Sequence, residues 1–180
     1  MNSRDARTLL ASAIAGQDGR WVDLGAGDGV FTRALVELLG PGSHVYALDR
    51  DAGALETLAR QPWAMAAGVT TVVADFDAAF ELPGLDAGGL AGILVANALH
   101  FVRDQSAVVG RLATRLRPGG RLVIVEYDRR AASQWVPYPI PIARLSALTA
   151  GTRLSAPVIT ASTPSVFGGD LYVAVTQAER

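Results

Sequence analysis

A glycine-rich turn between a buried strand and a helix most restricts what this chain can fold into. The apolar segment 21–24 precedes the turn, Gly25-Ala26-Gly27-Asp28-Gly29, and apolar residues then recur at helical spacing over 30–39. Glycine lets the backbone turn sharply and approach a ligand closely. Asp49 ends the next apolar segment, 20 residues after Gly29. A carboxylate at that point can accept hydrogen bonds from both hydroxyls of a ribose, so the spacing predicts an α/β fold that binds an adenosine-type ligand.

Strand and helix patterns alternate along most of the remaining chain. Helices are predicted over 4–16, 52–60, 105–116 and near 141–150, and strands over 44–48, 69–74, 92–96 and 121–127. Asp51 and Asp104 are placed to cap two of these helices, because their side chains can accept from first-turn amides. The last two predicted strands, 158–162 and 171–176, have no long helix between them, so we expect an antiparallel final strand. The alternation predicts a mainly parallel sheet with helices on both faces.

The composition fits a single globular domain, which we expect to span residues 1–180. Hydrophobic residues make up 50% of the chain, and no apolar run is long enough to cross a membrane. The run 9–15 behind Arg4 and Arg7 fits an amphipathic first helix better than a signal peptide, so a cytoplasmic location is expected. The absence of cysteine excludes disulfides, thiolate metal sites and a cysteine nucleophile. A net charge of −1 gives no overall positive field for nucleic acid.

Two features of the turn argue against a dinucleotide. The dinucleotide fingerprint needs a glycine at its sixth position, where this chain has Val30. Asp23, two residues before the first glycine, would repel a pyrophosphate but suits an ammonium group. A phosphate-binding P-loop is excluded as well, because the chain has no lysine.

Five segments carry a family resemblance when they are taken together and in order. They are Val22-Asp23-Leu24-Gly25-Ala26-Gly27-Asp28-Gly29, Tyr46-Ala47-Leu48-Asp49, Val73-Ala74-Asp75-Phe76, Asn97-Ala98-Leu99-His100-Phe101 and Leu116-Arg117-Pro118-Gly119-Gly120-Arg121-Leu122. The set resembles the class I S-adenosylmethionine (SAM)-dependent methyltransferases over residues 18–128. The resemblance implies SAM as cofactor, S-adenosylhomocysteine (SAH) as product, and a Rossmann-like, doubly wound, mostly parallel seven-stranded sheet with an antiparallel last strand in three α/β/α layers. One departure is Ala91, where many relatives have an acidic residue.

The resemblance also implies which residues bind the cofactor. The methionine portion would be held by Asp23 and by the backbone of Gly25, Ala26, Gly27 and Gly29. Asp49, beside Arg50, would accept from both ribose hydroxyls. Asp75 would accept from the adenine amino group, while the Phe76 amide would meet a ring nitrogen. Asn97 would lie beside the sulfonium.

The acceptor is expected at the ends of the fourth and fifth strands. The candidates there are His100, Tyr127, Asp128, Trp135 and Tyr138. His100 is the candidate general base, because a neutral imidazole near pH 7 can take a proton from a hydroxyl; the alternative is a histidine packed beside the sheet. The proline-containing segment 128–141 is expected to be a lid, or else a packed crossover loop. No metal is expected, because the carboxylates of Glu126 and Asp128 have no converging partners in the sequence.

A small molecule is the default acceptor, and a protein acceptor remains open. Nucleic acid is not expected, because the arginines on the helix face of Arg111 and Arg115 have no interleaved aromatic residues. A membrane partner is not expected either. Two other functions remain open: a non-catalytic SAM-binding or interaction module, and an aminopropyltransferase-like enzyme on the same fold. The sequence leaves the oligomeric state open.

Overall fold

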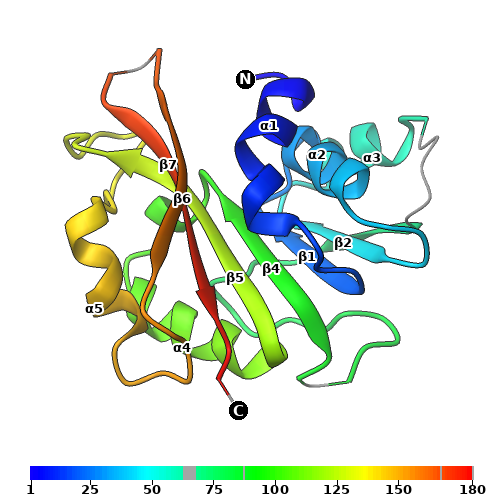
Figure 1. Cartoon of the computed structure of the whole chain (residues 1–180). Helices are drawn as coiled ribbons and strands as arrows, with labels where there is room; N and C mark the ends of the chain where they lie inside the picture. Colours follow the sequence, from blue (N-terminus) through cyan, green and yellow to red (C-terminus); the bar gives the residue numbers. More distant parts are fainter. Residues whose placement is uncertain (63–67, 87, 167, 180) are drawn as a thin grey trace.

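Seven strands form one sheet, in the order β3-β2-β1-β4-β5-β7-β6 (Figure 1). The computed structural model describes residues 1–62, 68–86, 88–166 and 168–179. The strands are β1 (Arg20–Leu24), β2 (His44–Asp49), β3 (Gly68–Val73), β4 (Leu90–Ala96), β5 (Leu116–Asp128), β6 (Val158–Pro164) and β7 (Asp170–Gln177). All neighbouring strands pair in parallel except β7, which is antiparallel to both β5 and β6. The predicted antiparallel last strand is therefore confirmed.

Helices cover both faces of the sheet. They are α1 (Ser3–Ile14), α2 (Val30–Leu38), α3 (Ala52–Ala59), α4 (Gln105–Arg115) and α5 (Leu145–Thr149), with short 3₁₀ turns η1 (Leu99–Phe101) and η2 (Ile142–Arg144). Apolar residues of α1 and α2 pack with Trp21 in one buried cluster, and those of α4 and α5 pack with Tyr172 in another. Because successive strand residues point to opposite faces, Trp21 and Val22 of β1 belong to different clusters. The three predicted α/β/α layers are thus confirmed.

The predicted helix caps form as expected. The Asp51 side chain accepts hydrogen bonds from Gly53 N and Ala54 N at the start of α3. The Asp104 side chain accepts from Ala107 N at the start of α4. Each cap provides an acceptor for amides that have none within the helix, which fixes where the helix begins.

The fifth strand begins earlier than the sequence predicts. We expected Pro118-Gly119-Gly120 to end the helix over 105–116 and turn the chain into a strand at 121–127, but α4 ends at Arg115 and β5 starts at Leu116. Leu116 pairs with Leu90, and the register with β4 shifts before Gly92 pairs with Arg121. Gly119 N also donates to Ala178 O. Neighbouring strands therefore take up the backbone groups around the glycines, and the predicted break is an irregularity within one strand.

The carboxyl ends of the five parallel strands β1 to β5 lie at one edge of the sheet, and those of β4 and β5 point to the upper part of Figure 1. The β6–β7 hairpin turns at the same edge, since Pro164 and Asp128 both pair with Asp170. The amino end of α1 lies there as well (Figure 1). No helix in the described ranges is long and apolar enough to span a membrane.

Candidate functional site

The glycine-rich loop 25–29 is tied to the end of β2. Gly25 N and Ala26 N both donate to Leu48 O, at 2.8 and 3.0 Å, and Gly27 N donates to the Asp49 carboxylate at 2.8 Å. Gly25, Gly27 and Gly29 have positive φ of 74°, 53° and 91°. These backbone conformations are easily adopted only by glycine. The three glycines therefore let the loop turn from β1 into α2 while its amides stay bonded to the neighbouring strand.

Asp49 holds the loop and still has acceptor capacity. Its Oδ2 accepts from Gly27 N, and its Oδ1 accepts from Asp51 N at 2.9 Å. An ionised carboxylate offers about four lone-pair sites, so about two remain for a ligand. Asp49 thus links the loops on either side of it and keeps acceptor capacity for a ligand.

A cavity of about 240 Å³ lies at the ends of β2, β3 and β4. Four residues predicted to bind adenosine line it: Asp49, Arg50, Asp75 and Phe76. Gly25 and Asn97 form part of the same wall. The remaining lining residues are Ala74, Asp77, Ala98, Phe101 and Val102, none of which was predicted to bind the cofactor.

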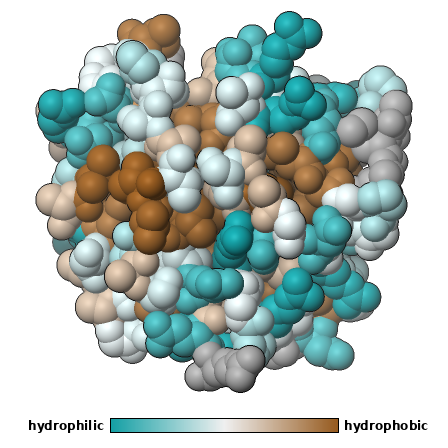
Figure 2. All heavy atoms as spheres, in the orientation of Figure 1, coloured by the Kyte–Doolittle hydropathy of each residue, from teal (hydrophilic) through white to brown (hydrophobic). Residues whose placement is uncertain are grey.

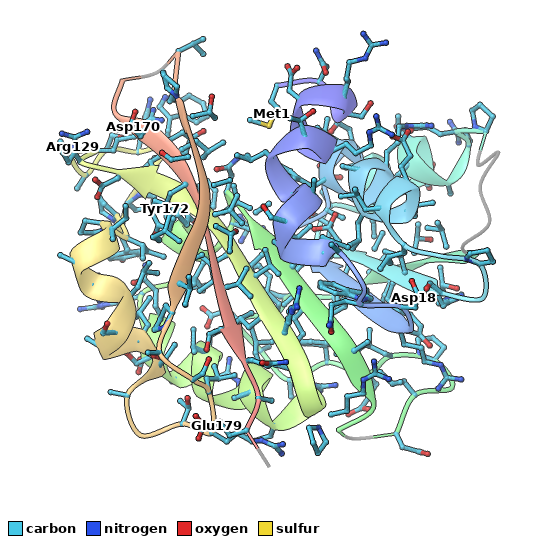
Figure 3. All side chains as sticks on the ribbon, in the orientation of Figure 1. Met1, Asp18, Arg129, Asp170, Tyr172 and Glu179 are labelled. Carbon is cyan, nitrogen blue, oxygen red and sulfur yellow. The ribbon has the colours of Figure 1, made fainter. Side chains whose placement is uncertain are left out.

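A larger cavity of about 920 Å³ adjoins the same loop, and Gly25 and Asn97 belong to the walls of both cavities. Its walls come from α1, the glycine-rich loop, the first turn of α2, the ends of β4 and β5, and the β6–β7 hairpin. Figure 3 shows Met1 at the amino end of α1, on the side that faces β6. Figure 2 shows the molecular surface notched between this end of α1 and the hairpin tip.

Asn97 lies at the junction of the two cavities in an unusual backbone conformation. Its φ is +52°, in the left-handed region that non-glycine residues seldom occupy. Its N–H donates to Val125 O at 2.9 Å, which fixes the turn after β4 against β5. Its side-chain Oδ1 is buried and has no partner among the described residues. A buried carbonyl without a donor is costly, so this atom is suited to receive a hydrogen bond from a ligand or water.

Asp23 lies beneath the loop, outside the walls of both cavities as described. Its carboxyl group is 1% exposed and accepts a hydrogen bond of 2.7 Å from the Thr32 hydroxyl. Burial raises the pKa of Asp23 from 3.8 to about 7; the Thr32 hydrogen bond opposes this shift and the charge of Asp49 adds to it. Asp23 can therefore add negative charge under the loop when a positive ligand stabilises its ionised form.

His100 is buried behind these cavities. Its side chain is 3% exposed, and its Nδ1 is 2.7 Å from Oε2 of Glu126, which is itself buried. Neither cavity wall, as described, includes His100. The structure thus brings Asn97 into the site but places the predicted base behind the wall, held by a carboxylate.

Of the other acceptor-site candidates, Tyr127 lines the larger cavity. Burial raises the pKa of its hydroxyl, and the Arg130 guanidinium lies 4.6 Å from its ring centre. Asp128, Trp135 and Tyr138 do not line either cavity among the described residues. Within the same residues, no group of three or more His, Asp or Glu could hold a metal ion.

The segment 128–141, expected to be a lid, packs beside the sheet in this structure. Val136 and Ile140 are buried, and Tyr138 N donates to His100 O. Trp135, whose ring was expected to cover the acceptor, is 69% exposed. These contacts correspond to the alternative of a packed crossover loop.

Sequence reasoning missed the walls supplied by α1 and the hairpin. Residues such as Asp5, Phe31 and Ser162 line the larger cavity. Each belongs to an ordinary amphipathic helix or edge strand, so no local motif marks it. Their common role arises from the tertiary contact between α1 and β6.

Comparisons with known proteins agree with this fold. A family model described as a methyltransferase domain matches residues 22–122. The structure of the CurJ carbon methyltransferase is similar with a TM-score of 0.73 at 19% identity, covering 99% of this chain and 54% of that one. This chain therefore spans about half the length of that protein. No curated protein sequence matches significantly.

Two further solved structures are similar over most of both chains. The 1,6-didemethyltoxoflavin-N1-methyltransferase of Burkholderia thailandensis, with 1,6-didemethyltoxoflavin and SAH bound, has a TM-score of 0.72 at 23% identity and covers 99% of this chain and 78% of that one. The magnesium protoporphyrin IX methyltransferase of Synechocystis PCC 6803, with SAM bound, has a TM-score of 0.71 at 17% identity and covers 98% and 79%.

Proposed function

Since the chain belongs to the methyltransferase-domain family, we propose that it transfers the methyl group of SAM to a small molecule bound in the larger cavity. The cofactor is SAM and the product is SAH, in keeping with the class I fold. The observation that carries the proposal is that two cavities share Gly25 and Asn97 as common wall. Such a junction lets a donor whose adenosine lies in the smaller cavity present its methyl group to an acceptor in the larger one.

The described residues fit the cofactor. The carboxylates of Asp49 and Asp75 in the smaller cavity suit the ribose hydroxyls and the adenine amino group, with Arg50 and Phe76 beside them. The backbone of Gly25, Ala26 and Gly27 suits the methionine portion, because no side chain keeps a ligand away from it. Gly29 makes the close turn into α2.

Two further groups favour a positively charged methionine end. Asp23 beneath the loop can supply negative charge toward the ammonium. Asn97 Oδ1, which lacks a partner among the described residues, lies at the junction where the sulfonium belongs. Polar atoms that are already fixed around a positive centre stabilise it without reorganising.

When SAM is bound it supplies an electrophilic methyl carbon, which an acceptor lone pair takes while the carbon–sulfur bonding pair returns to sulfur. The protein's part is mainly to align the acceptor and to exclude water. In our proposal the acceptor lies against Tyr127 and the β6–β7 hairpin, in line with the shared wall at Asn97.

We assign the general base to His100. The carboxylate of Glu126 holds its Nδ1, and within the described residues Nε2 makes no hydrogen bond. Nε2 can therefore take up a proton. Because the ring lies behind the cavity wall, the proton would reach it through water or through a shift of the η1 turn.

We also propose that residues 1–180 form one domain, since α1, α2, α4 and α5 pack on one seven-stranded sheet and α3 contacts β2 and β3 of that sheet. A small-molecule acceptor is favoured by a cavity of about 920 Å³, a size common for small-molecule sites. The titles of two structural neighbours also name small molecules, a toxoflavin precursor and a magnesium porphyrin.

Calorimetry on the purified protein tests the cofactor assignment. SAH should bind with one-to-one stoichiometry, while NAD should produce no heat. Asp49→Ala should weaken SAH binding, and Asp86→Ala, an exposed site outside both described cavity walls, should not. Tight NAD binding without SAH binding would overturn the proposal.

Turnover separates catalysis from binding alone. Labelled SAM incubated with a mixture of small metabolites should pass its methyl label to a recoverable product. SAH binding without any label transfer, to small molecules or protein, would favour a non-catalytic module. Transfer of an aminopropyl group would favour the aminopropyltransferase alternative.

A further inference from the structure

The larger cavity carries negative charge and aromatic rings. Asp5 of α1 and Asp28 of the glycine-rich loop line it from two sides, and the rings of Phe31 and Tyr127 belong to the same wall. All sixteen basic residues of the chain are arginines, and none of them lies in the described part of this wall. Carboxylates combined with aromatic faces are the groups that bind an ammonium ion.

The two carboxylates are available to a ligand. Asp5 and Asp28 are both exposed, and within the described residues neither forms an ion pair or a side-chain hydrogen bond. Only the backbone of each is engaged: Asp5 N donates to Asn2 Oδ1, and Asp28 O accepts from Gln61 Nε2. Their charge is therefore not neutralised by a neighbour.

The positive groups at this cavity do not outnumber its carboxylates within the described wall. Arg130 lies over the Tyr127 ring, outside the described wall. The amino group of Met1 belongs to a residue that is 56% exposed at the rim, where solvent and salt screen it. Within the described wall, the two carboxylates of Asp5 and Asp28 therefore outnumber the single amino group of Met1.

The rest of the wall is apolar enough to bind a hydrocarbon body. Leu9, Val30, Ala161, Pro164, Val166 and Leu171 all contribute to it. Figure 2 shows apolar surface at the hairpin tip and hydrophilic surface at the amino end of α1, on opposite sides of the notch. The cavity thus combines an acidic side with an apolar side.

We propose, resting on the methyltransferase function above, that the acceptor is an amine carried on an apolar or aromatic body. Acidic acceptors such as carboxylates and phosphate esters are disfavoured, because they would meet Asp5 and Asp28 without an arginine to pair with. The charged amino group sits between these carboxylates and the rings of Phe31 and Tyr127, and the body lies against the hairpin.

Matched probes of opposite charge test this proposal. Phenethylamine and phenylacetate share an aromatic body, and each is titrated into the SAH-saturated protein by calorimetry. Phenethylamine should bind about tenfold more tightly than phenylacetate, since the same carboxylates attract one and repel the other. Salt should weaken the binding of the amine.

Variants link the preference to the two carboxylates. The double variant Asp5→Asn and Asp28→Asn should reduce the charge preference to below about threefold, because both nearby charges are removed. Asp86→Asn removes an exposed carboxylate outside the described wall and should leave the preference unchanged. SAH binding is measured first on every variant.

The outcomes are distinguishable. Failure to bind SAH would overturn the proposed function itself. Normal SAH binding with equal or tighter binding of phenylacetate, or with no binding of phenethylamine at millimolar concentration, would overturn the amine proposal alone. A preference for the amine that survives the double variant would also contradict it.

Discussion

Glu126 accepts two hydrogen bonds from His100, one from the backbone N–H at 3.1 Å and one from the ring Nδ1 at 2.7 Å. Both side chains are buried, at 0% and 3% exposure. A hydrogen bond from Nδ1 to the carboxylate leaves Nε2 as the ring nitrogen that can accept a proton. The same carboxylate fixes the η1 turn after Asn97 against β5.

His100→Ala should retain SAH affinity while slowing methyl transfer by roughly 10²–10⁴-fold, the range expected for loss of a general base. Calorimetry and single-turnover kinetics with the identified acceptor measure the two effects. A loss smaller than about threefold, well below that range, would assign His100 to packing.

Glu126→Gln tests the pairing without emptying the site. The amide can donate to Nδ1 and so shift the ring proton to Nε2, which removes the basic lone pair. We expect turnover to fall while SAH affinity stays, together with a changed pH–rate profile. An unchanged profile would restrict Glu126 to holding the turn.

Alanine substitutions at Gly25 and Gly27 test whether each glycine is needed for the fold or for ligand binding. A Cβ on Gly25 would lie 2.6 Å from the Ala98 Cβ, whereas a Cβ on Gly27 meets nothing within 4 Å. Gly25→Ala should therefore lower the free energy of unfolding by about 1–3 kcal/mol. Gly27→Ala should cost only the strain of its positive φ, about 1 kcal/mol, but weaken SAH binding strongly.

Gly110 in α4 gives the control for these alanine substitutions. Its Cβ position is also open, so Gly110→Ala should raise the free energy of unfolding by about 0.5–1 kcal/mol and leave SAH binding unchanged. Denaturant titration and calorimetry measure both quantities. Normal SAH binding by Gly27→Ala would show that the ligand does not approach this loop.

Asp49→Ala should affect ligand binding and stability together. Loss of a charged acceptor costs about 1.5–3 kcal/mol of SAH affinity. The free energy of unfolding should also fall, because Gly27 N and Asp51 N lose their acceptor. A folded variant with unchanged SAH affinity would mean that Asp49 serves the loop alone.

Asp23 should make stability and cofactor affinity depend on pH. Because burial raises its pKa from 3.8 to about 7, the native state holds a proton that the unfolded state releases, and stability falls as pH rises from about 4 to about 7. Above that range the loss is complete. Asp23→Asn should remove most of this slope in urea unfolding, since the amide does not titrate and can still accept from Thr32.

SAH affinity should show the opposite trend. The ammonium of the ligand favours ionised Asp23, so affinity should rise as pH increases through about 7. Calorimetry in buffers of different ionisation enthalpy should detect proton release on binding. No proton release in the wild-type protein would contradict an interaction between Asp23 and the ligand.

The sequence predicted which residues would meet at the smaller cavity, because those residues follow neighbouring parallel strands. Asp49, Asp75 and Asn97 each end or follow a short apolar segment, and parallel strands bring those ends together. The order of the strands along the chain is therefore enough to predict that these three residues lie at one cavity. The start of the fifth strand was predicted five residues too late, because Leu116 pairs with the neighbouring strand although Pro118 and Gly119 favour a break.

The acceptor half could not be predicted in the same way. Asp5 and Ser162 line one cavity although they are far apart in sequence and belong to elements with ordinary patterns. His100 shows a related limit. Its position after Asn97 predicted a side chain exposed to the site. The ring instead contacts the buried carboxylate of Glu126, which follows 26 residues later in the sequence.

The antiparallel β6–β7 hairpin at the sheet edge lies apart from the residues proposed to bind the cofactor. The residues proposed to bind the cofactor lie on β1 to β4 and their loops, whereas the hairpin pairs with β5 and contacts α1 beside the larger cavity. If the acceptor binds as proposed, substitutions in the hairpin should change which molecule is methylated without altering the residues proposed to bind SAM. For protein engineering, β6 (Val158–Pro164) and β7 (Asp170–Gln177) are therefore the strands to randomise when a new acceptor is sought.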